Sequence, residues 1–109
     1  MAIPHARSGQ VIDVRPLGAA LTGVRTTALF KTDDLEVMRL VLAAGKSLPP
    51  HRVAGETTIQ CIGGRIDVTL DGESRILNAG HLIYLARDVD HGVVAIENAS
   101  VLVTIALHR

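Results

Sequence analysis

Short runs of apolar and β-branched residues recur along the chain about every ten residues, with glycine, proline, aspartate or asparagine between them. In one of these runs, residues 65–71, polar and apolar side chains alternate strictly. A period of two gives a strand one face in water and one face in the core. Helical periodicity is nearly absent from the rest of the chain. The pattern therefore predicts an all-β protein.

The turn residues divide the chain into about nine or ten short strands. These are expected at 11–14, 26–31, 35–43, 57–62, 65–71, 74–77, 82–85, 91–96 and 101–107. Gly63-Gly64 and Asp71-Gly72 are dipeptides typical of two-residue β-hairpin turns. Pro49-Pro50 excludes a helix and interrupts any strand ladder at that point. Residues 19–25 are interpreted either as a turn of helix or as a loop.

A chain with this many strands must protect its sheet edges, and a barrel or jelly roll does so. The chain has 109 residues and contains no linker or internal repeat, so residues 1–109 are predicted to form a single domain. Residues from about 35 to 107 are expected to form the barrel. The less regular residues from 1 to about 30 are expected to form an arm that covers an edge, in their own subunit or in a partner.

Composition excludes several classes of protein. Lysines plus arginines equal aspartates plus glutamates at 11 each, and the only aromatic residues are Phe30 and Tyr84, so no nucleic-acid partner is expected. No apolar run approaches the roughly 20 residues of a membrane helix, and no membrane partner is expected. Cys61 is the only cysteine, which favours a reducing compartment, and the N-terminus lacks the apolar stretch of a signal peptide. The expected location is the cytoplasm.

A structured site is expected away from the chain ends. Three of the five histidines meet this condition: His51, His81 and His91. His81 directly follows a turn glycine and is interpreted as a surface or strand-cap residue. His51 and His91 each lie within a segment that also contains spaced glycines. These two segments carry the main functional signal.

The first segment resembles the first motif of the cupins of the RmlC-like jelly-roll type. In that motif a glycine is followed after five residues by His-x-His, after three or four more by Glu, and after six more by Gly. Gly45, His51, Glu56 and Gly63 are matched to it. Gly80 and His91 match the glycine and the histidine of the second motif. The resemblance implies a cupin-type double-stranded β-helix, or jelly-roll barrel.

The family's metal centre uses three histidines and a glutamate, and the resemblance implies that His51, Glu56 and His91 hold a divalent metal ion such as Zn, Fe, Mn or Ni. The chain departs from the motif at Val53, which replaces the second histidine. Two histidines and a carboxylate still suffice in facial-triad iron sites. Gln60 lies on the same strand face as Glu56 in a period-two pattern, and it is an alternative oxygen donor.

Each of these residues also has a structural interpretation. His51 and His91 could simply line the barrel mouth, Glu56 could be a solvated turn residue beside Gly55, and Gln60 could belong to a structural hydrogen-bond network.

Three function classes follow. The leading hypothesis is a metal-binding cupin that acts on or binds a small polar molecule, with no reaction assigned and no catalytic residue named. The alternatives are a small-ligand binding or sensing module with a degenerate, metal-free site, and a structural or oligomerisation barrel. A homodimer is predicted, because an irregular arm and exposed apolar strand faces need cover and because small cupins resemble one another in forming homodimers.

Overall fold

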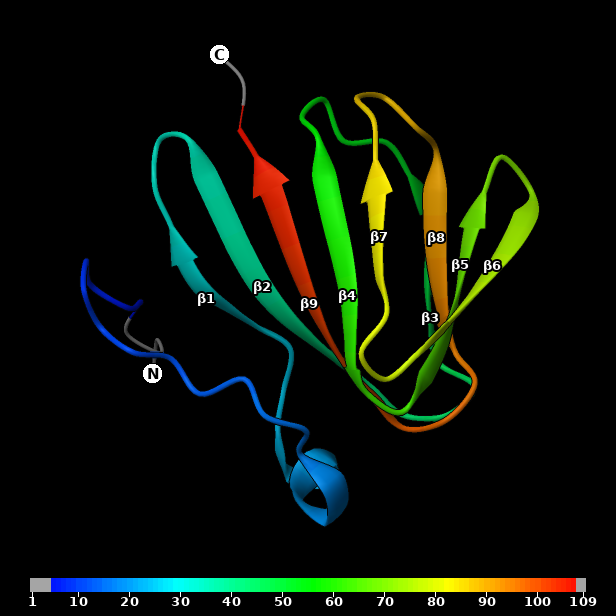
Figure 1. Cartoon of the computed structure of the whole chain (residues 1–109). Helices are drawn as coiled ribbons and strands as arrows, with labels where there is room; N and C mark the ends of the chain where they lie inside the picture. The colour runs from blue at the N-terminus through cyan, green and yellow to red at the C-terminus, as the bar shows by residue number, and fades with distance from the viewer. Residues whose placement is uncertain (1–4, 108–109) are drawn as a thin grey trace.

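A computed structural model describes residues 5–107, and its nine strands in that range form two antiparallel sheets (Figure 1). Sheet A has the strand order β1-β2-β9-β4-β7, and sheet B has the order β3-β8-β5-β6. The strands are β1 (Thr27–Lys31), β2 (Leu35–Leu42), β3 (Ser47–His51), β4 (Thr57–Gly63), β5 (Arg65–Leu70), β6 (Glu73–Asn78), β7 (Leu82–Leu85), β8 (His91–Ala95) and β9 (Ala99–Ala106).

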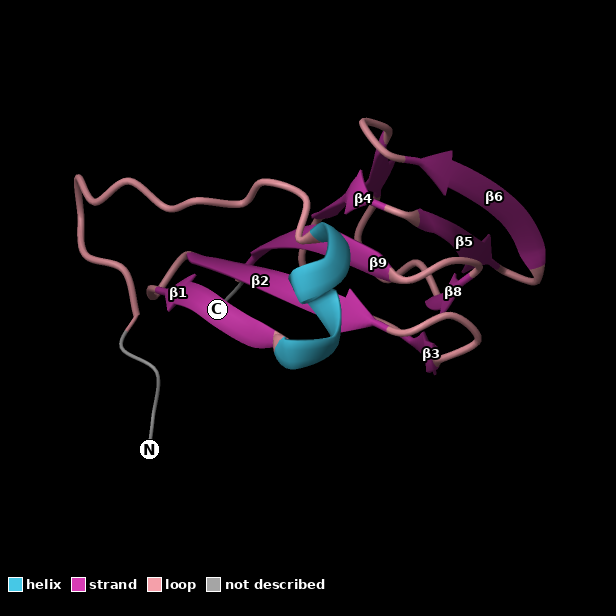
Figure 2. Ribbon diagram, turned by 90° about the horizontal axis from the view of Figure 1, so that it is seen from below, coloured by secondary structure: helices cyan, strands magenta, loops and turns pink. Residues whose placement is uncertain are grey.

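The two sheets pack face to face, and their inward-facing residues form one core (Figures 1 and 2). This core includes Ile59 of β4, Val101 of β9, and Ile66 and Val68 of β5, and all four side chains are fully buried. The strictly alternating segment is β5, as predicted. The predicted all-β, jelly-roll fold is confirmed, and each strand predicted from residue 26 onward has a counterpart. Residues 11–14, by contrast, form no strand.

The segment with two prolines is an edge strand of sheet B. β3 pairs with β8 at Ser47 and Leu48, then again at His51, with a register irregularity between them. Proline has no backbone N–H to donate, so Pro49 and Pro50 leave a gap in the ladder. The predicted interruption is confirmed.

The predicted hairpin at Gly63-Gly64 is wrong, because β4 and β5 belong to different sheets and do not pair. Gly64 instead lets the chain cross from sheet A to sheet B. Its φ is +80°, and a Cβ placed there would lie 2.0 Å from the carbonyl oxygen of Asn98. The Asp71-Gly72 hairpin is confirmed: Leu70 pairs with Glu73, and φ is positive at both turn residues, as a type I′ turn requires.

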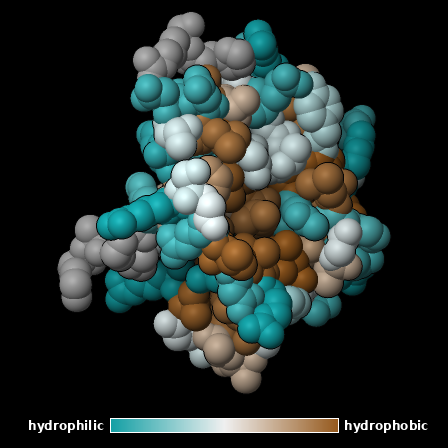
Figure 3. Space-filling model, turned by 60° about the vertical axis from the view of Figure 1, so that its left-hand side comes forward, coloured by the Kyte–Doolittle hydropathy of each residue, from teal (hydrophilic) through white to brown (hydrophobic). Residues whose placement is uncertain are grey.

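The N-terminal arm runs along the outer side of sheet A (Figure 2). It is tied to the β1 edge by a 2.9 Å hydrogen bond from the N–H of Ala6 to the carbonyl of Leu29. Residues 18–23 form a 3-10 helix, whose Leu21 is buried. With the side of β1 and the arm turned toward the viewer, hydrophobic side chains gather across the middle of the surface, among hydrophilic ones (Figure 3).

No helix in the part of the chain that the structure describes is long and apolar enough to span a membrane. The predicted homodimer stays a prediction, because the structure contains a single chain.

Two glycine substitutions test the sheet crossover. Gly64 and Gly72 have nearly the same φ, +80° and +83°, but a Cβ at Gly72 would have nothing within 4 Å. Gly72→Ala therefore adds only backbone strain, and we expect it to lower the free energy of unfolding by about 1 kcal/mol. Gly64→Ala adds a clash with backbone, and we expect a loss of about 3 kcal/mol or more. Urea denaturation measures both, and equal losses would contradict the crossover geometry.

Candidate ligand-binding site

A cavity of about 130 Å³ lies between the two sheets. Its polar lining consists of the side chains of His51, Thr57 and His91. The remaining lining residues are apolar and come from both sheets: Met38, Leu40, Leu48, Val53, Ile59, Val93, Val103 and Ile105. The cavity is therefore an apolar chamber with a small polar region.

The two histidines form the main polar feature of this cavity. His51 at the end of β3 lies directly opposite His91 at the start of β8 in the strand ladder. Their ring centroids are 4.7 Å apart, with an angle of 47° between the ring planes. His51 is exposed, whereas His91 is only 5% exposed. The pair thus connects the cavity with the surface.

Backbone carbonyls determine how each imidazole presents its nitrogens. Nδ1 of His51 lies 3.3 Å from the carbonyl oxygen of Pro49, and Nδ1 of His91 lies 3.1 Å from that of Val89. A carbonyl oxygen only accepts, so each neutral ring is assigned the tautomer in which Nδ1–H donates. Nε2 of each ring is then left with a free lone pair. The site offers two acceptors, or two nitrogen ligands.

The loops at this end of the barrel are tied together by their backbones. The N–H of Asp88 donates to the carbonyl of Val53 at 3.0 Å, and Asp88 has a positive φ of 61°. Aspartate tolerates this left-handed conformation better than most residues. The bond links the segment that follows His51 to the loop that precedes His91.

Glu56 and Gln60 are not brought to the histidine pair. Glu56 is exposed, and its Oε2 accepts a 2.5 Å hydrogen bond from the hydroxyl of Tyr84. Gln60 alternates with Ile59 and Cys61, which are fully buried, so its side chain faces the outer side of sheet A. Glu56 and Gln60 were predicted to share one face of the strand, and the burial pattern agrees with this. That face, however, points away from the cavity. The structure therefore does not bring Glu56 and Gln60 to the two histidines, and their role as metal ligands stays a prediction.

Thr57 is the lining residue that the sequence reasoning missed. It is 2% exposed, and it lies where β4 begins. The signal was present in the spacing: three residues separate Val53 from Thr57, and six more lead to Gly64, which is the spacing of the first cupin motif. In this register the four ligand positions are His51, Val53, Thr57 and His91, and all four line the cavity.

This donor set does not fit the metal centre that the family resemblance implies. Stable zinc sites in proteins use three or four nitrogen, sulfur or carboxylate ligands. Here the four positions supply two imidazoles, one hydroxyl and one aliphatic side chain. Across residues 5–107, no group of three or more His, Cys, Asp or Glu side chains is placed to share a metal ion.

The Glu56–Tyr84 hydrogen bond gives a direct titration test. It raises the pKa of Tyr84, aided by partial desolvation and by the negative charge of Glu56, while Arg87 opposes the rise. We expect Glu56→Gln to lower the pKa of Tyr84 toward its ordinary value, whereas Glu73→Gln, on β6 of the other sheet, leaves it unchanged. Tyr84 is the only tyrosine and there is no tryptophan, so near-ultraviolet absorbance reports tyrosinate cleanly.

The raised pKa of Tyr84 also makes the free energy of unfolding depend on pH. The folded state holds the Tyr84 proton more tightly than the unfolded chain does, so this contribution is complete below the ordinary tyrosine pKa and is lost as pH rises through the folded pKa. An identical tyrosinate titration in the wild type and in Glu56→Gln would contradict the hydrogen bond.

Comparison with known proteins identifies the family of the chain. The Cupin_2 model, a cupin domain, matches residues 38–107. The pectin degradation protein KdgF of Dickeya dadantii is 30% identical over 82 residues, which cover 74% of each chain.

Solved structures with a similar fold agree with this family assignment. A conserved protein of unknown function from Streptococcus pyogenes superposes with a TM-score of 0.77 at 19% identity, covering 100% of this chain and 97% of its own. KdgF from Halomonas sp. superposes with a TM-score of 0.69 at 26% identity, covering 77% of this chain and 78% of its own. The fold and the matching family model lead to one conclusion: this chain is a small cupin of the Cupin_2 family.

Proposed function

We propose that this cupin binds a small molecule with an apolar body and one hydroxyl group, and that it does so without a resident metal ion. The observation that supports this most is the position of His51 and His91 at the polar end of an otherwise apolar cavity. With Nδ1 committed to a backbone carbonyl, each neutral imidazole accepts a hydrogen bond through Nε2. A hydroxyl donor is the group that this arrangement suits.

The size of the cavity limits the ligand. An apolar protein cavity of about 150 Å³ holds a benzene molecule. The cavity of about 130 Å³ here suits a ring of similar size, such as phenol, with Thr57 as one further polar contact. No carboxylate side chain lines the cavity within residues 5–107, so the two histidines are its only acid–base groups. A binding or sensing role fits this lining better than turnover does.

The name of the KdgF protein of Dickeya dadantii suggests a more polar ligand than phenol, and we do not propose such a ligand for this chain. The Dickeya protein is called a pectin degradation protein. Pectin is a polysaccharide of sugar acids, which carry several hydroxyl groups and a carboxylate. Each hydroxyl of a sugar acid needs a partner when buried, and the carboxylate needs a cation or several donors. Three polar side chains among eight apolar ones do not supply them. Galacturonate is therefore the natural negative probe.

A divalent metal ion is the second candidate, favoured by the two free Nε2 lone pairs on neighbouring rings. In that case His51 and His91 would be the two protein ligands of Zn, Fe, Mn or Ni. With only two strong ligands, we expect weak binding that does not survive purification.

Ligand binding is tested with three probes, followed by amide NMR. We expect phenol to shift the resonances around the cavity saturably, toluene of the same size to bind at least tenfold more weakly, and galacturonate to have no effect there. A hydroxyl has one proton and donates to one imidazole at a time, so the double variant His51→Leu/His91→Leu removes both acceptors and should weaken phenol binding about tenfold. Gln60→Ala, on the outer face of sheet A, is the matched control. Equal binding of phenol by the wild type and His51→Leu/His91→Leu would refute the proposal.

Metal independence is tested by restoring the missing ligand. We expect the wild type to retain no stoichiometric metal after growth with added Mn, Fe, Ni or Zn. Val53→His places a third imidazole in the cavity lining and should raise zinc affinity at least tenfold, measured by calorimetry. Val11→His, at a 92% exposed arm position, controls for a histidine added at the surface. Stoichiometric metal in the wild type, lost in the double variant His51→Ala/His91→Ala, would establish the metal candidate instead.

A further inference from the structure

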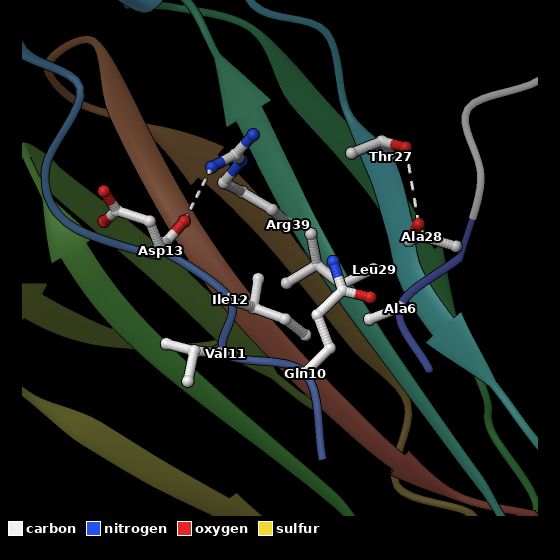
Figure 4. A pocket seen from close by; sticks show the side chains of 9 residues that line it. All are labelled: Ala6, Gln10, Val11, Ile12, Asp13, Thr27, Ala28, Leu29 and Arg39. Atoms are coloured by element: carbon white, nitrogen blue, oxygen red, sulfur yellow. Dashed lines mark hydrogen bonds between the residues drawn. The ribbon is translucent and has the colours of Figure 1, made fainter. Parts of the chain in front are cut away.

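A second cavity, of about 300 Å³, lies outside the barrel, between the arm and strands β1 and β2 (Figure 4). Residues 10–13 of the arm form one side, and Thr27, Ala28 and Leu29 of β1 form the other. Arg39 enters from β2, where it occupies the outward-facing position between Met38 and Leu40 of the barrel cavity. This cavity belongs to the opposite face of sheet A and shares no lining residue with the histidine site.

The guanidinium of Arg39 has little to bind within the described chain. Its Nε is buried and has no hydrogen-bond partner. Its Nη1 reaches only the backbone carbonyl of Asp13, at 3.5 Å, the outer limit of a hydrogen bond (Figure 4). A guanidinium has five N–H donors, and leaving them unmatched in a partly buried place costs free energy. The side chain is thus a cation with unused donors.

The carboxylate of Asp13, which lines the same cavity, does not neutralise Arg39. Asp13 lies in the same cavity, but its two oxygens accept hydrogen bonds from Arg15, at 3.0 Å from Nε and 2.6 Å from Nη2. Arg15 lowers the pKa of Asp13 to about 2, and Arg39 adds a smaller effect in the same direction. The Asp13–Arg15 pair is neutral overall, so the three groups together carry one positive charge.

The rest of the cavity lining includes apolar side chains and one available hydrogen-bond donor, the side-chain amide of Gln10. Ile12, Leu29 and Ala28 are apolar, and the hydroxyl of Thr27 is directed to the carbonyl of Ala28. Oε1 of Gln10 accepts a bond from the backbone N–H of Arg7, which leaves the amide NH₂ of Gln10 with no partner among the described residues. The cavity therefore offers a guanidinium, an amide donor and an apolar wall.

We propose that this cavity binds a small carboxylate with an apolar chain, whose carboxylate is held by the N–H groups of Arg39 and whose chain packs against Ile12 and Leu29. A planar guanidinium matches a carboxylate with two parallel hydrogen bonds, and such pairs are stronger than bonds between neutral groups. The NH₂ of Gln10 is the additional donor from the arm. The ligand links the arm to the sheet, because its contacts come from both.

The test uses hexanoate as the probe and the full chain as the protein. We expect hexanoate to shift, saturably, the amide resonances of residues 10–13 and 27–29, and hexanol to bind at least tenfold more weakly because it lacks the charge. Arg39→Met should weaken hexanoate binding at least tenfold, whereas Arg39→Lys keeps the charge but loses the fork and should be intermediate. Arg65→Met, at an exposed arginine of β5, is the matched control.

Amide dispersion and the unfolding temperature establish that each variant is folded. If Arg39→Met does not fold, the comparison of hexanoate with hexanol in the wild type and Arg39→Lys still decides the matter. The absence of saturable shifts in the wild type, equal binding of hexanoate and hexanol, or shifts confined to residues around His51 and His91 would each overturn the proposal.

Discussion

The pairing of β9 with two neighbours at once is the interaction on which the rest of the structure depends. One edge of β9 pairs with β2 over eight residue pairs, from Ala99 opposite Leu42 to Ala106 opposite Leu35, and the other edge pairs with β4. These registers place the inward residues of three strands against one cavity. Sheet B supplies the facing histidines, which the β3–β8 ladder brings opposite each other. The period of two along β2 then gives sheet A a cavity on each face, with Met38 and Leu40 lining the barrel cavity and Arg39 the arm cavity.

Much of the fold could be predicted from local sequence, because strands and hairpins depend on neighbouring residues. The alternation in β5 and the Asp71-Gly72 turn were readable in this way. Gly63-Gly64 was not, because a glycine pair that allows a tight hairpin also allows a close backbone approach. At Gly64 the close backbone approach is to the carbonyl of Asn98, which lies more than thirty residues away in sequence, and this contact distinguishes it from a hairpin. No local pattern contains that contact.

The site was predictable in part for a related reason. His51 and His91 were found from their spacing to glycines, and the structure brings them together. Thr57, at the start of β4, was missed because Glu56, one residue earlier, has a carboxylate and is the more obvious candidate ligand. A shift of one residue on a strand exchanges its two faces. Burial in β4 settles the register, since Thr57, Ile59 and Cys61 face inward while Glu56 turns to Tyr84 at the surface.

His51 and His91 present two Nε2 lone pairs to an apolar cavity, because backbone carbonyls hold their Nδ1 protons. Nitrogen NMR of the two imidazoles, in metal-free protein and in the neutral state, tests this arrangement of protons, since it distinguishes the tautomers. We expect both rings to carry the proton on Nδ1. A proton on Nε2 of either ring would contradict it.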